Sequence, residues 1–591
     1  QLSQAESMTM AIVGATRHST PSSSPSVRLP PSRMRLVGMG LGLLFVALLG
    51  RSIYLQLVKQ DFLQNQGAAR YSRSIQLEAY RGVITDRNGE PLAISTPVQS
   101  IWASPADMEP VPVDKINQLA RLLEMDPGEV SRKLADKRRE FLYLKRQISP
   151  ELADAVMKLG IPGIAKQQEY RRFYPAGEMM AHVVGFTGVD GRGQEGLELA
   201  KEKMLAGKPG SRHVIKDRRG HIIEDIAAIE RPRDGQTLSL SIDRKIQYLA
   251  FRELKTAVEN FKARAGGIVV LDAHTGEVLA LANLPSFNPN NRQRLDPSMK
   301  RNRALTDLFE PGSTLKPFTV ARALDLGIVR PDQVFNTESY SIGPARIKDS
   351  HAASSLAVWE IIQKSSNVGS SKIALLMQPQ TLWQMFDEVG FGRPPQSGFP
   401  GEASGRVRPY KTWKPIEQAT MSYGHGISLS LMQLARAYTI FTNDGELKPV
   451  SFMRLDQPLP GKQVIRPDTA RKMRDMLMTV TQPGGTAPRA QVLGFTVGGK
   501  TGTAHKQEGR GYAASKYISS FVGFAPATRP RLIVAVMIDE PQGQYYGGTV
   551  AGPVFSAVMS GSLRILGVEP DAPTNNTLIP LDSIPEVREE T

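Results

Sequence analysis

The sequence predicts an α+β protein whose main domain, residues 235–568, is an antiparallel sheet covered by helices. A smaller domain (59–234) and one membrane-spanning helix (36–58) are expected to precede it. Three observations indicate this organisation. A long run near the N-terminus is apolar, short apolar strands flank turn residues in pairs, and segments with helical apolar spacing lie around these pairs. Helices and paired strands in separate stretches of a chain are typical of the α+β class.

The composition limits the classes of function. Lys and Arg outnumber Asp and Glu by 73 to 57, and a net charge of +16 would suit a nucleic acid, a membrane surface or an anionic substrate. No basic run is interleaved with aromatic residues, so we expect no nucleic-acid partner. The chain has no cysteine, which excludes disulfides and thiol chemistry. Its eight histidines form no metal-like cluster, so we predict no metal and no cofactor.

The N-terminal segments are predicted from their polarity. Residues 1–35 contain a stretch rich in Ser and Pro with several arginines, which is typical of a disordered tail on the cytoplasmic side. Residues 36–58 would form a helix of about 35 Å, long enough to cross a membrane. The alternatives are a cleaved signal peptide and a buried helix. The region before Gly50 lacks a small-residue cleavage pattern, and the basic tail argues against burial, so we favour an uncleaved anchor.

Residues 59–234 show no sign of chemistry. The stretch 81–93 is typical of two strands joined at an Asn-Gly turn, and 116–123 and 127–134 have the apolar spacing of helices. Paired carboxylates with a cleft signature and a phosphate loop are both missing. We therefore expect a spacer or docking domain.

Residues 235–568 have the patterns of a complete α+β domain. Asp243 is suited to cap a helix, and apolar residues follow it at helical spacing. Two strand pairs and a closing helix are expected at 267–272 and 277–282, at 518–525 and 532–538, and at 552–566. The end of the chain, 569–591, is acidic and rich in proline, and is predicted to be disordered.

A serine and a lysine mark the candidate active site. In the stretch EPGSTLK (310–316), Ser313 and Lys316 would lie on one face of a helix, with Ser313 at its N-terminus after Pro311 and Gly312. A serine hydroxyl is a weak nucleophile until a base accepts its proton. Lys316 can be that base only if burial and nearby cations lower its pKa. A Ser-x-x-Lys match also arises by chance in a chain of this length, so it does not establish a site alone.

Two later motifs complete the pattern. Ser365 and Asn367 form a Ser-x-Asn motif, and residues 500–503 read Lys-Thr-Gly-Thr. On a strand, Lys500 and Gly502 would face one side and the two threonines the other, and the glycine would let a substrate backbone approach. Each motif alone is weak. The three in this order are the set described for penicillin-binding proteins and serine β-lactamases.

On these motifs the chain resembles a class B penicillin-binding protein over residues 36–568. The stretches that carry the resemblance in the smaller domain are 81–93, 172–177 and 193–196, and they resemble the elongated, non-catalytic pedestal or dimerisation-type domain of that class. The resemblance implies that residues 235–568 form a penicillin-binding/serine β-lactamase-like transpeptidase domain. The sequences KSSNVG (364–369) and GGTVAGPVF (547–555) resemble the division-specific, septal subgroup.

The resemblance also implies a peptidoglycan D,D-transpeptidase with named roles for residues. Ser313 would attack a D-Ala-D-Ala stem peptide to form an acyl-enzyme, Lys316 would accept its proton, and an amine of a neighbouring stem would complete the cross-link. Ser365 would move a proton, Asn367 would hold Lys316 or the substrate, and Lys500 would attract the substrate carboxylate. The N–H groups of Ser313 and Thr503 would form the oxyanion hole. The residues expected to contact substrate are Thr501, Gly502, Thr503, His425, Tyr545 and Tyr546.

The expected partners and location follow from the same resemblance. They are stem peptides, β-lactam antibiotics that acylate Ser313, a membrane glycan polymerase and other division proteins. The protein would be a single-pass protein of the inner membrane, with the catalytic domain in the periplasm at the division site. Rival interpretations are a serine β-lactamase, a D-Ala carboxypeptidase, a bifunctional class A enzyme and a non-catalytic division scaffold.

His425 departs from the pattern of the family, which often has Tyr or Gln between the two glycines of this loop. We expect a helix N-terminus at the following apolar run and the charge of Lys500 to lower the pKa of His425 from about 6.5. Two interpretations stay open. His425 is either a neutral residue that hydrogen-bonds a loop carbonyl, or a group whose protonation changes acylation at acidic pH.

Overall fold

The computed structural model describes residues 31–59, 72–216, 222–292, 295–351, 353–509 and 511–573. It forms two compact units, one of residues 1–74, 213–217 and 221–226 and the other of the remaining chain. The predicted tails lie mostly outside the described residues. The exceptions are 31–35, which begin a helix, and 569–573.

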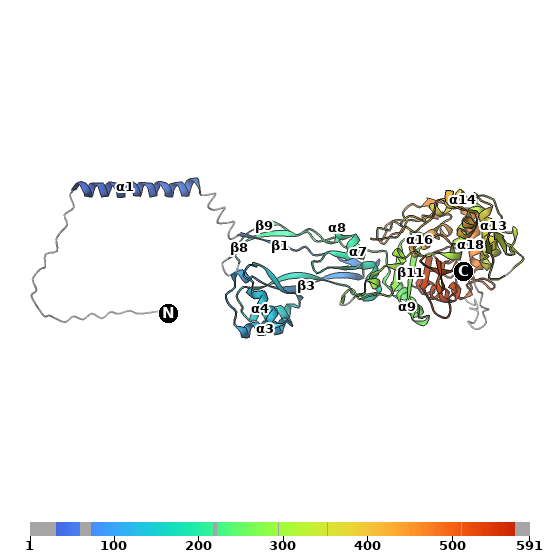
Figure 1. Cartoon of the computed structure of the whole chain (residues 1–591), viewed down its shortest axis with the longest axis horizontal. Helices are drawn as coiled ribbons and strands as arrows, with labels where there is room; N and C mark the ends of the chain where they lie inside the picture. Colours follow the sequence, from blue (N-terminus) through green and yellow to red (C-terminus); the bar gives the residue numbers. More distant parts are fainter. Residues whose placement is uncertain are drawn as a thin grey trace, which may run out of the picture. The chain divides into compact units, whose positions relative to one another are not determined.

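The first unit contains the apolar helix. Helix α1 (Pro31–Ile53) continues as one π-helical segment, η1 (Tyr54–Val58) (Figure 1). Within it, Ser32–Gln56 is long and apolar enough to cross a membrane, and none of that stretch is buried. The helix begins five residues before the predicted span, because apolarity marks the part that suits lipid, whereas Pro31 is tolerated in a first helical turn. Strand β1 (Ser72–Leu77) follows and pairs with β8 (Gly210–Lys216), which also pairs with β9 (Ile222–Glu230).

A long strand organises the smaller domain. Strand β3 (Pro91–Ala103) pairs antiparallel with β2 (Ile84–Thr85), β4 (Leu142–Ile148) and β5 (Ile164–Phe173). The predicted strand-turn-strand at 81–93 is confirmed, with Asp86 holding the turn through its bonds to the N–H groups of Asn88 and Glu90. Helices α3 (Val113–Leu123), α4 (Pro127–Ala135) and α5 (Pro150–Lys158) share one apolar core with the sheet, and the domain also contains the short helices α6 (Ala181–Val184), α7 (Gly196–Ala200) and α8 (Glu202–Leu205). The first two were predicted.

A buried ion cluster joins distant parts of this domain. Glu198 is fully buried, and its carboxylate accepts bonds of 2.7 Å from the Nε atoms of Arg81 and Arg172. Arg172 also donates to the carbonyl of Gly82 at 2.7 Å. A buried carboxylate is stable only when it is paired and hydrogen-bonded, and here two guanidinium groups meet that need. The arginines belong to the stretches on which the resemblance rests, whereas Glu198 lies just beyond 193–196.

The main domain is built on a five-stranded antiparallel sheet. Its strand order is β12 (Val278–Leu284), β11 (Ala265–Asp272), β21 (Leu532–Asp539), β20 (Gly511–Ala525) and β19 (Gly498–Glu508). Every pairing along this order is antiparallel, so the predicted hairpins and the α+β class are confirmed. Strand β19 is at the edge of the sheet and carries the Lys-Thr-Gly motif.

Helices cover both faces of this sheet. Helix α9 (Arg244–Asn260) begins at Asp243, whose carboxylate accepts from two N–H groups of the first turn, as predicted. A Cβ atom added at Gly266 would point toward α9. A Cβ atom added at Gly267 would point toward Leu431 of α16 (Leu431–Ala437). Successive residues of a strand point to opposite faces, so α9 and α16 cover different faces. The closing helix α20 (Gly552–Ile565) packs beside α9 (Figure 1).

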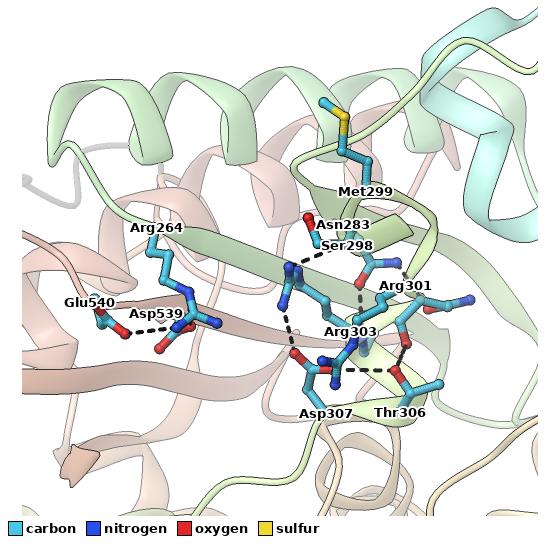
Figure 2. A network of polar contacts seen from close by, with 12 residues as sticks. Arg264, Asn283, Ser298, Met299, Arg301, Arg303, Thr306, Asp307, Asp539 and Glu540 are labelled. Carbon is cyan, nitrogen blue, oxygen red and sulfur yellow. Dashed lines mark hydrogen bonds and ion pairs between the residues drawn. The ribbon is translucent and has the colours of Figure 1, made fainter. Parts of the chain in front are cut away.

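A polar network fixes the segment that leads to the nucleophile. Figure 2 shows Arg301 and Arg303 converging on Asp307, with bonds of 2.6 and 2.8 Å. Asn283 of β12 accepts from the backbone N–H of Ala304 at 2.8 Å. The network lies around helix α10 (Arg303–Thr306). It therefore ties the sheet to the chain just before residue 310.

Candidate active site

Ser313 lies in a tight turn in front of a buried helix. Residues Gly312–Leu315 form the 3₁₀ segment η5, and the α-helix α11 (Lys316–Asp325) begins at Lys316. The predicted place of Ser313 is the helix N-terminus, and in the structure Ser313 lies in the 3₁₀ turn that leads into the α-helix. Pro317 explains this, because a residue without an N–H is favoured at the start of an α-helix. The Nζ atom of Lys316 lies 2.8 Å from Ser313 Oγ, and Lys316 is fully buried.

Ser365 lies in the break between two helices. It ends α12 (Val358–Lys364) with a φ of +61°, and Ser366 caps the next helix, α13 (Asn367–Leu375). A positive φ is uncommon for serine and marks a position that surrounding contacts hold in place. Lys316 Nζ donates to the carbonyl of Ser365 at 2.5 Å and to its Oγ at 3.1 Å.

Lys500 approaches the same hydroxyl from the edge strand. Its Nζ lies 2.8 Å from Ser365 Oγ and 3.2 Å from Thr501 Oγ1, and the side chain is fully buried. The structure thus brings Ser313, Lys316, Ser365 and Lys500 into one chain of hydrogen bonds. Two buried ammonium groups at one hydroxyl disfavour each other's positive charge, which is the condition that Lys316 needs to act as a base.

Asn367 is the first residue of α13 and is half-buried beside this chain of bonds. The hydrogen bonds that the structure describes for Lys316 go to Ser313 and Ser365. A contact of Asn367 with Lys316 or with a substrate amide therefore stays a prediction.

The hydroxyls of the two threonines on the edge strand bond to neighbouring segments. Thr501 Oγ1 bonds to Thr486 Oγ1 at 2.9 Å, and Thr503 Oγ1 accepts from the N–H of Gly547 at 3.0 Å. Gly502 faces the other side, as alternation predicts. A Cβ on Gly502 would lie 2.8 Å from the carbonyl oxygen of Pro311, so close packing against the nucleophile's own segment already requires glycine there. Substrate contact at all three positions stays a prediction.

Tyr545 and Tyr546 lie next to this strand, just before α19 (Gly547–Val550). Their hydroxyls are 3.1 Å apart, and the ring of Tyr545 stacks on Tyr517 with ring centres 4.0 Å apart. Gly547 links them to the site through its bond to Thr503. Both rings are half-buried, and their contact with substrate stays a prediction.

Glu310, three residues before the nucleophile, gathers several segments around it. Its side chain is 3% exposed, and its Oε1 accepts from the N–H of Gly426 and the amide of Gln507, both at 2.9 Å. Tyr512 donates to the same carboxylate at 3.0 Å. Burial raises the pKa of Glu310, and these three donors act in the opposite direction.

His425 packs against this carboxylate. Its Nδ1 lies 3.5 Å from Glu310 Oε2, and its side chain is 21% exposed. Burial, and after it the neighbouring Lys316 and His505, lower the pKa of His425 to about 4. The predicted direction is confirmed, but the cause differs. Neither Lys500 nor the terminus of α16, which begins at Leu431, is among the causes of this shift.

Some residues of the site had no signal in the sequence. Asp349 accepts from Ser366 Oγ at 2.5 Å and from the N–H of Val368 at 2.9 Å, so it holds the turn around Ser365. A Cβ on Gly424 would lie 2.2 Å from the carbonyl oxygen of Gly312. The glycines that flank His425 are the only sequence signal of this close contact between the two backbone segments. Asp349 is one acidic residue in a loop, and no pattern distinguishes it.

Models of two known domain families match the chain. The model of the penicillin-binding protein transpeptidase domain matches residues 266–560. The model of the penicillin-binding protein dimerisation domain matches residues 76–240. The two matches cover most of the residues that the structure describes beyond α1.

Curated relatives share most of the chain. A probable peptidoglycan D,D-transpeptidase PenA of Neisseria meningitidis is 46% identical over 545 residues, which are 92% of this chain and 94% of that protein. The peptidoglycan D,D-transpeptidase FtsI of Escherichia coli is 43% identical over 533 residues, 89% of this chain and 90% of that protein.

A solved structure matches the main domain. The apo transpeptidase domain of Burkholderia pseudomallei penicillin-binding protein 3 has a TM-score of 0.53 and 51% identity, and the match covers 56% of this chain and 98% of that one. Its fold is therefore shared by the domain that carries Ser313. With a dimerisation domain ahead of a transpeptidase domain, and with relatives that match over nine-tenths of its length, the chain belongs to the class B penicillin-binding proteins.

Proposed function

We propose that this protein is a peptidoglycan D,D-transpeptidase that works through a Ser313 acyl-enzyme. The observation that carries the proposal is the hydrogen-bonded chain from Ser313 through Lys316 and Ser365 to Lys500. Lys316 accepts the proton of Ser313 as the hydroxyl attacks the D-Ala-D-Ala carbonyl. Ser365, between the two lysines, passes a proton to the leaving D-alanine. The relatives named as D,D-transpeptidases support this substrate class.

The edge strand supports the binding of an extended peptide. Strand β19 ends the sheet, and an edge strand presents unpaired backbone groups to which another strand can add. A stem peptide added there would lie beside Ser313, and we propose that Lys500, Thr501 and Thr503 bind its terminal carboxylate in addition to their present partners. The N–H groups of Ser313 and Thr503 would bind the oxyanion. Asn367, Gly502, His425, Tyr545 and Tyr546 complete the proposed site.

The test is intact mass after treatment with benzylpenicillin. The full chain in detergent should gain one penicilloyl group that persists for hours, and Ser313→Ala should gain none while keeping the thermal unfolding temperature of the wild type. Labelling of Ser313→Ala would reject this nucleophile. Rapid loss of the adduct would instead indicate a β-lactamase, and release of D-alanine without any cross-linked product would indicate a carboxypeptidase.

We also propose that α1 anchors the protein in the inner membrane and that the enzyme acts during septal wall synthesis. The apolar stretch Ser32–Gln56 supports the anchor, and the relative named FtsI supports the division role. In this setting a membrane glycan polymerase and other division proteins are the expected partners. Deleting residues 1–60 should release a protein that is soluble and still acylated.

The septal role is tested in cells. A fluorescent fusion of the protein should gather at the division site, and depletion of the protein should give filamentous cells. An even distribution along the cell would contradict the septal role.

A further inference from the structure

The second half of transpeptidation requires a group that the chain of lysines does not supply. An acceptor amine attacks the acyl-enzyme only in its neutral form, with its lone pair aimed at the ester carbonyl. Of the two lysines that bond to Ser365 beside the nucleophile, Lys500 is a donor and Lys316 has to accept the proton that the amine loses, so neither orients the N–H that stays on the amine. A hydrogen-bond acceptor at the mouth of the site would orient the N–H of the amine and leave its lone pair free.

His425 is placed to be that acceptor. Its neighbour Gly424 packs directly on the backbone of Gly312, the residue before Ser313. The ring lies edge-on to Tyr423 and Tyr512, with ring centres 5.4 and 6.2 Å away, and part of its edge reaches the surface. The lowered pKa of His425 keeps the imidazole neutral, so one ring nitrogen retains a free lone pair at physiological pH.

Glu310 determines which nitrogen that is. Its Oε2 faces Nδ1 at 3.5 Å, and a carboxylate on that side favours the tautomer with the proton on Nδ1. The carboxylate is buried, and within the described part of the chain its contacts are neutral donors and His425, with no Lys or Arg paired to it. The pair thus leaves Nε2 as the free acceptor.

We propose that His425 binds the acceptor amine of the second substrate through Nε2 and that Glu310 is the positioning residue that fixes its tautomer. The inference rests on the proposed function. In the reaction the amine nitrogen forms the new C–N bond, the ester bond to Ser313 Oγ breaks, and one amine proton ends on that oxygen by way of Lys316. His425 accepts a hydrogen bond and does not itself gain the proton.

The experiment separates the two half-reactions. The full-length protein in detergent is given a D-alanyl thioester as donor and D-alanine as the acceptor probe, and the aminolysis and hydrolysis products are measured together. For His425→Phe we expect the ratio of aminolysis to hydrolysis to fall by about three- to tenfold, as for the loss of one hydrogen bond, and to fall further than the rate of acylation by benzylpenicillin. The matched control is His505→Phe, the same change on a neighbouring ring that packs on Tyr517, and its ratio should stay that of the wild type.

Two further variants make the test specific. Glu310→Gln keeps the size of the side chain and an oxygen for Gly426, but its amide would donate to Nδ1 and move the imidazole proton to Nε2. It should lower the ratio as His425→Phe does. His425→Gln restores an acceptor oxygen and should recover part of the ratio.

The outcomes are distinct. An unchanged ratio in His425→Phe, or equal loss of acylation and aminolysis, would overturn the inference and leave His425 a structural residue. An equal fall in His505→Phe would do the same. If the wild type forms no acyl-enzyme with either donor, the proposed function itself fails.

Discussion

Asp349 and Ser366 are joined by a 2.5 Å hydrogen bond that fixes the turn carrying Ser365. The second oxygen of Asp349 accepts from the N–H of Val368 at 2.9 Å, so the carboxylate caps α13 from outside the helix. Ser365 itself has a positive φ of 61°, which costs energy for a residue other than glycine. The orientation of its hydroxyl toward both lysines therefore depends on contacts made by its neighbours.

Asp349→Asn should slow acylation because an amide can accept only one of these two bonds. Bonds to a charged acceptor contribute about 1.5–3 kcal/mol, so we expect the second-order rate constant with benzylpenicillin to fall about tenfold or more. Asp332→Asn is the matched control, since Asp332 lies in an exposed loop whose side chain is 81% exposed. Equal rate constants for wild type and Asp349→Asn would show that the turn holds without the carboxylate.

Lys500→Met should slow acylation while preserving the fold. Methionine keeps most of the buried volume but removes the donor to Ser365 and the charge that disfavours a positive Lys316. We expect a loss of roughly 10- to 100-fold in the acylation rate constant, the equivalent of one charged hydrogen bond. Lys516→Met, on β20 and bonded to Glu508 at the surface, provides the control. Wild-type acylation by Lys500→Met would place Lys500 outside the reaction.

Gly424→Ala should damage the nucleophile's turn more than Gly426→Ala does. Both glycines have a positive φ, 93° and 77°, so alanine is strained at either position, by about 1–2 kcal/mol. Only at Gly424 would the new Cβ strike the backbone of Gly312, 2.2 Å from its carbonyl oxygen, whereas at Gly426 the nearest atoms are 3.9 Å away. The measurements are urea unfolding and acylation of both variants. If the two lose stability and acylation equally, the close contact does not hold the turn.

Much of the fold could be predicted because its signals are local. The strands at 267–272 and 532–538 are continuous apolar runs bounded by turn residues, and Asp243 is a strong cap in front of a periodic segment. The spacing of Ser313 and Lys316 predicted their contact because it depends on one turn of helix alone. The structure differs from the prediction only in the type of turn, because Gly312–Leu315 form a 3₁₀ turn in front of the α-helix.

The parts that could not be predicted depend on distant contacts. Asp349 and Glu310 are single acidic residues, and their importance comes from partners at Ser366 and at Gly426 that only the folded chain brings near. The predicted cause of the lowered pKa of His425 was wrong for the same reason. Burial is a property of the packed loop, whereas the sequence suggested only the nearby helix and Lys500.

The pKa of His425 predicts how the protein responds to acid. Because it is about 4, the imidazole should stay neutral from about pH 5 to 8, and the acylation profiles of wild type and His425→Tyr should run parallel in that range. Divergence with a midpoint near 6.5 would instead identify a titrating switch.

The stability of the folded protein should respond differently to acid. Between the unfolded pKa of about 6.5 and the folded value, the unfolded chain binds more protons at this residue, so the free energy of unfolding falls as the pH falls. On going from about pH 7 to 5 the wild type should lose about 2 kcal/mol more than His425→Tyr, because 1.4 kcal/mol corresponds to each unit below 6.5. Urea unfolding of both proteins at the two pH values measures the difference, and the other histidines cancel in it. Equal losses would show that His425 is protonated as easily in the folded protein as in the unfolded chain.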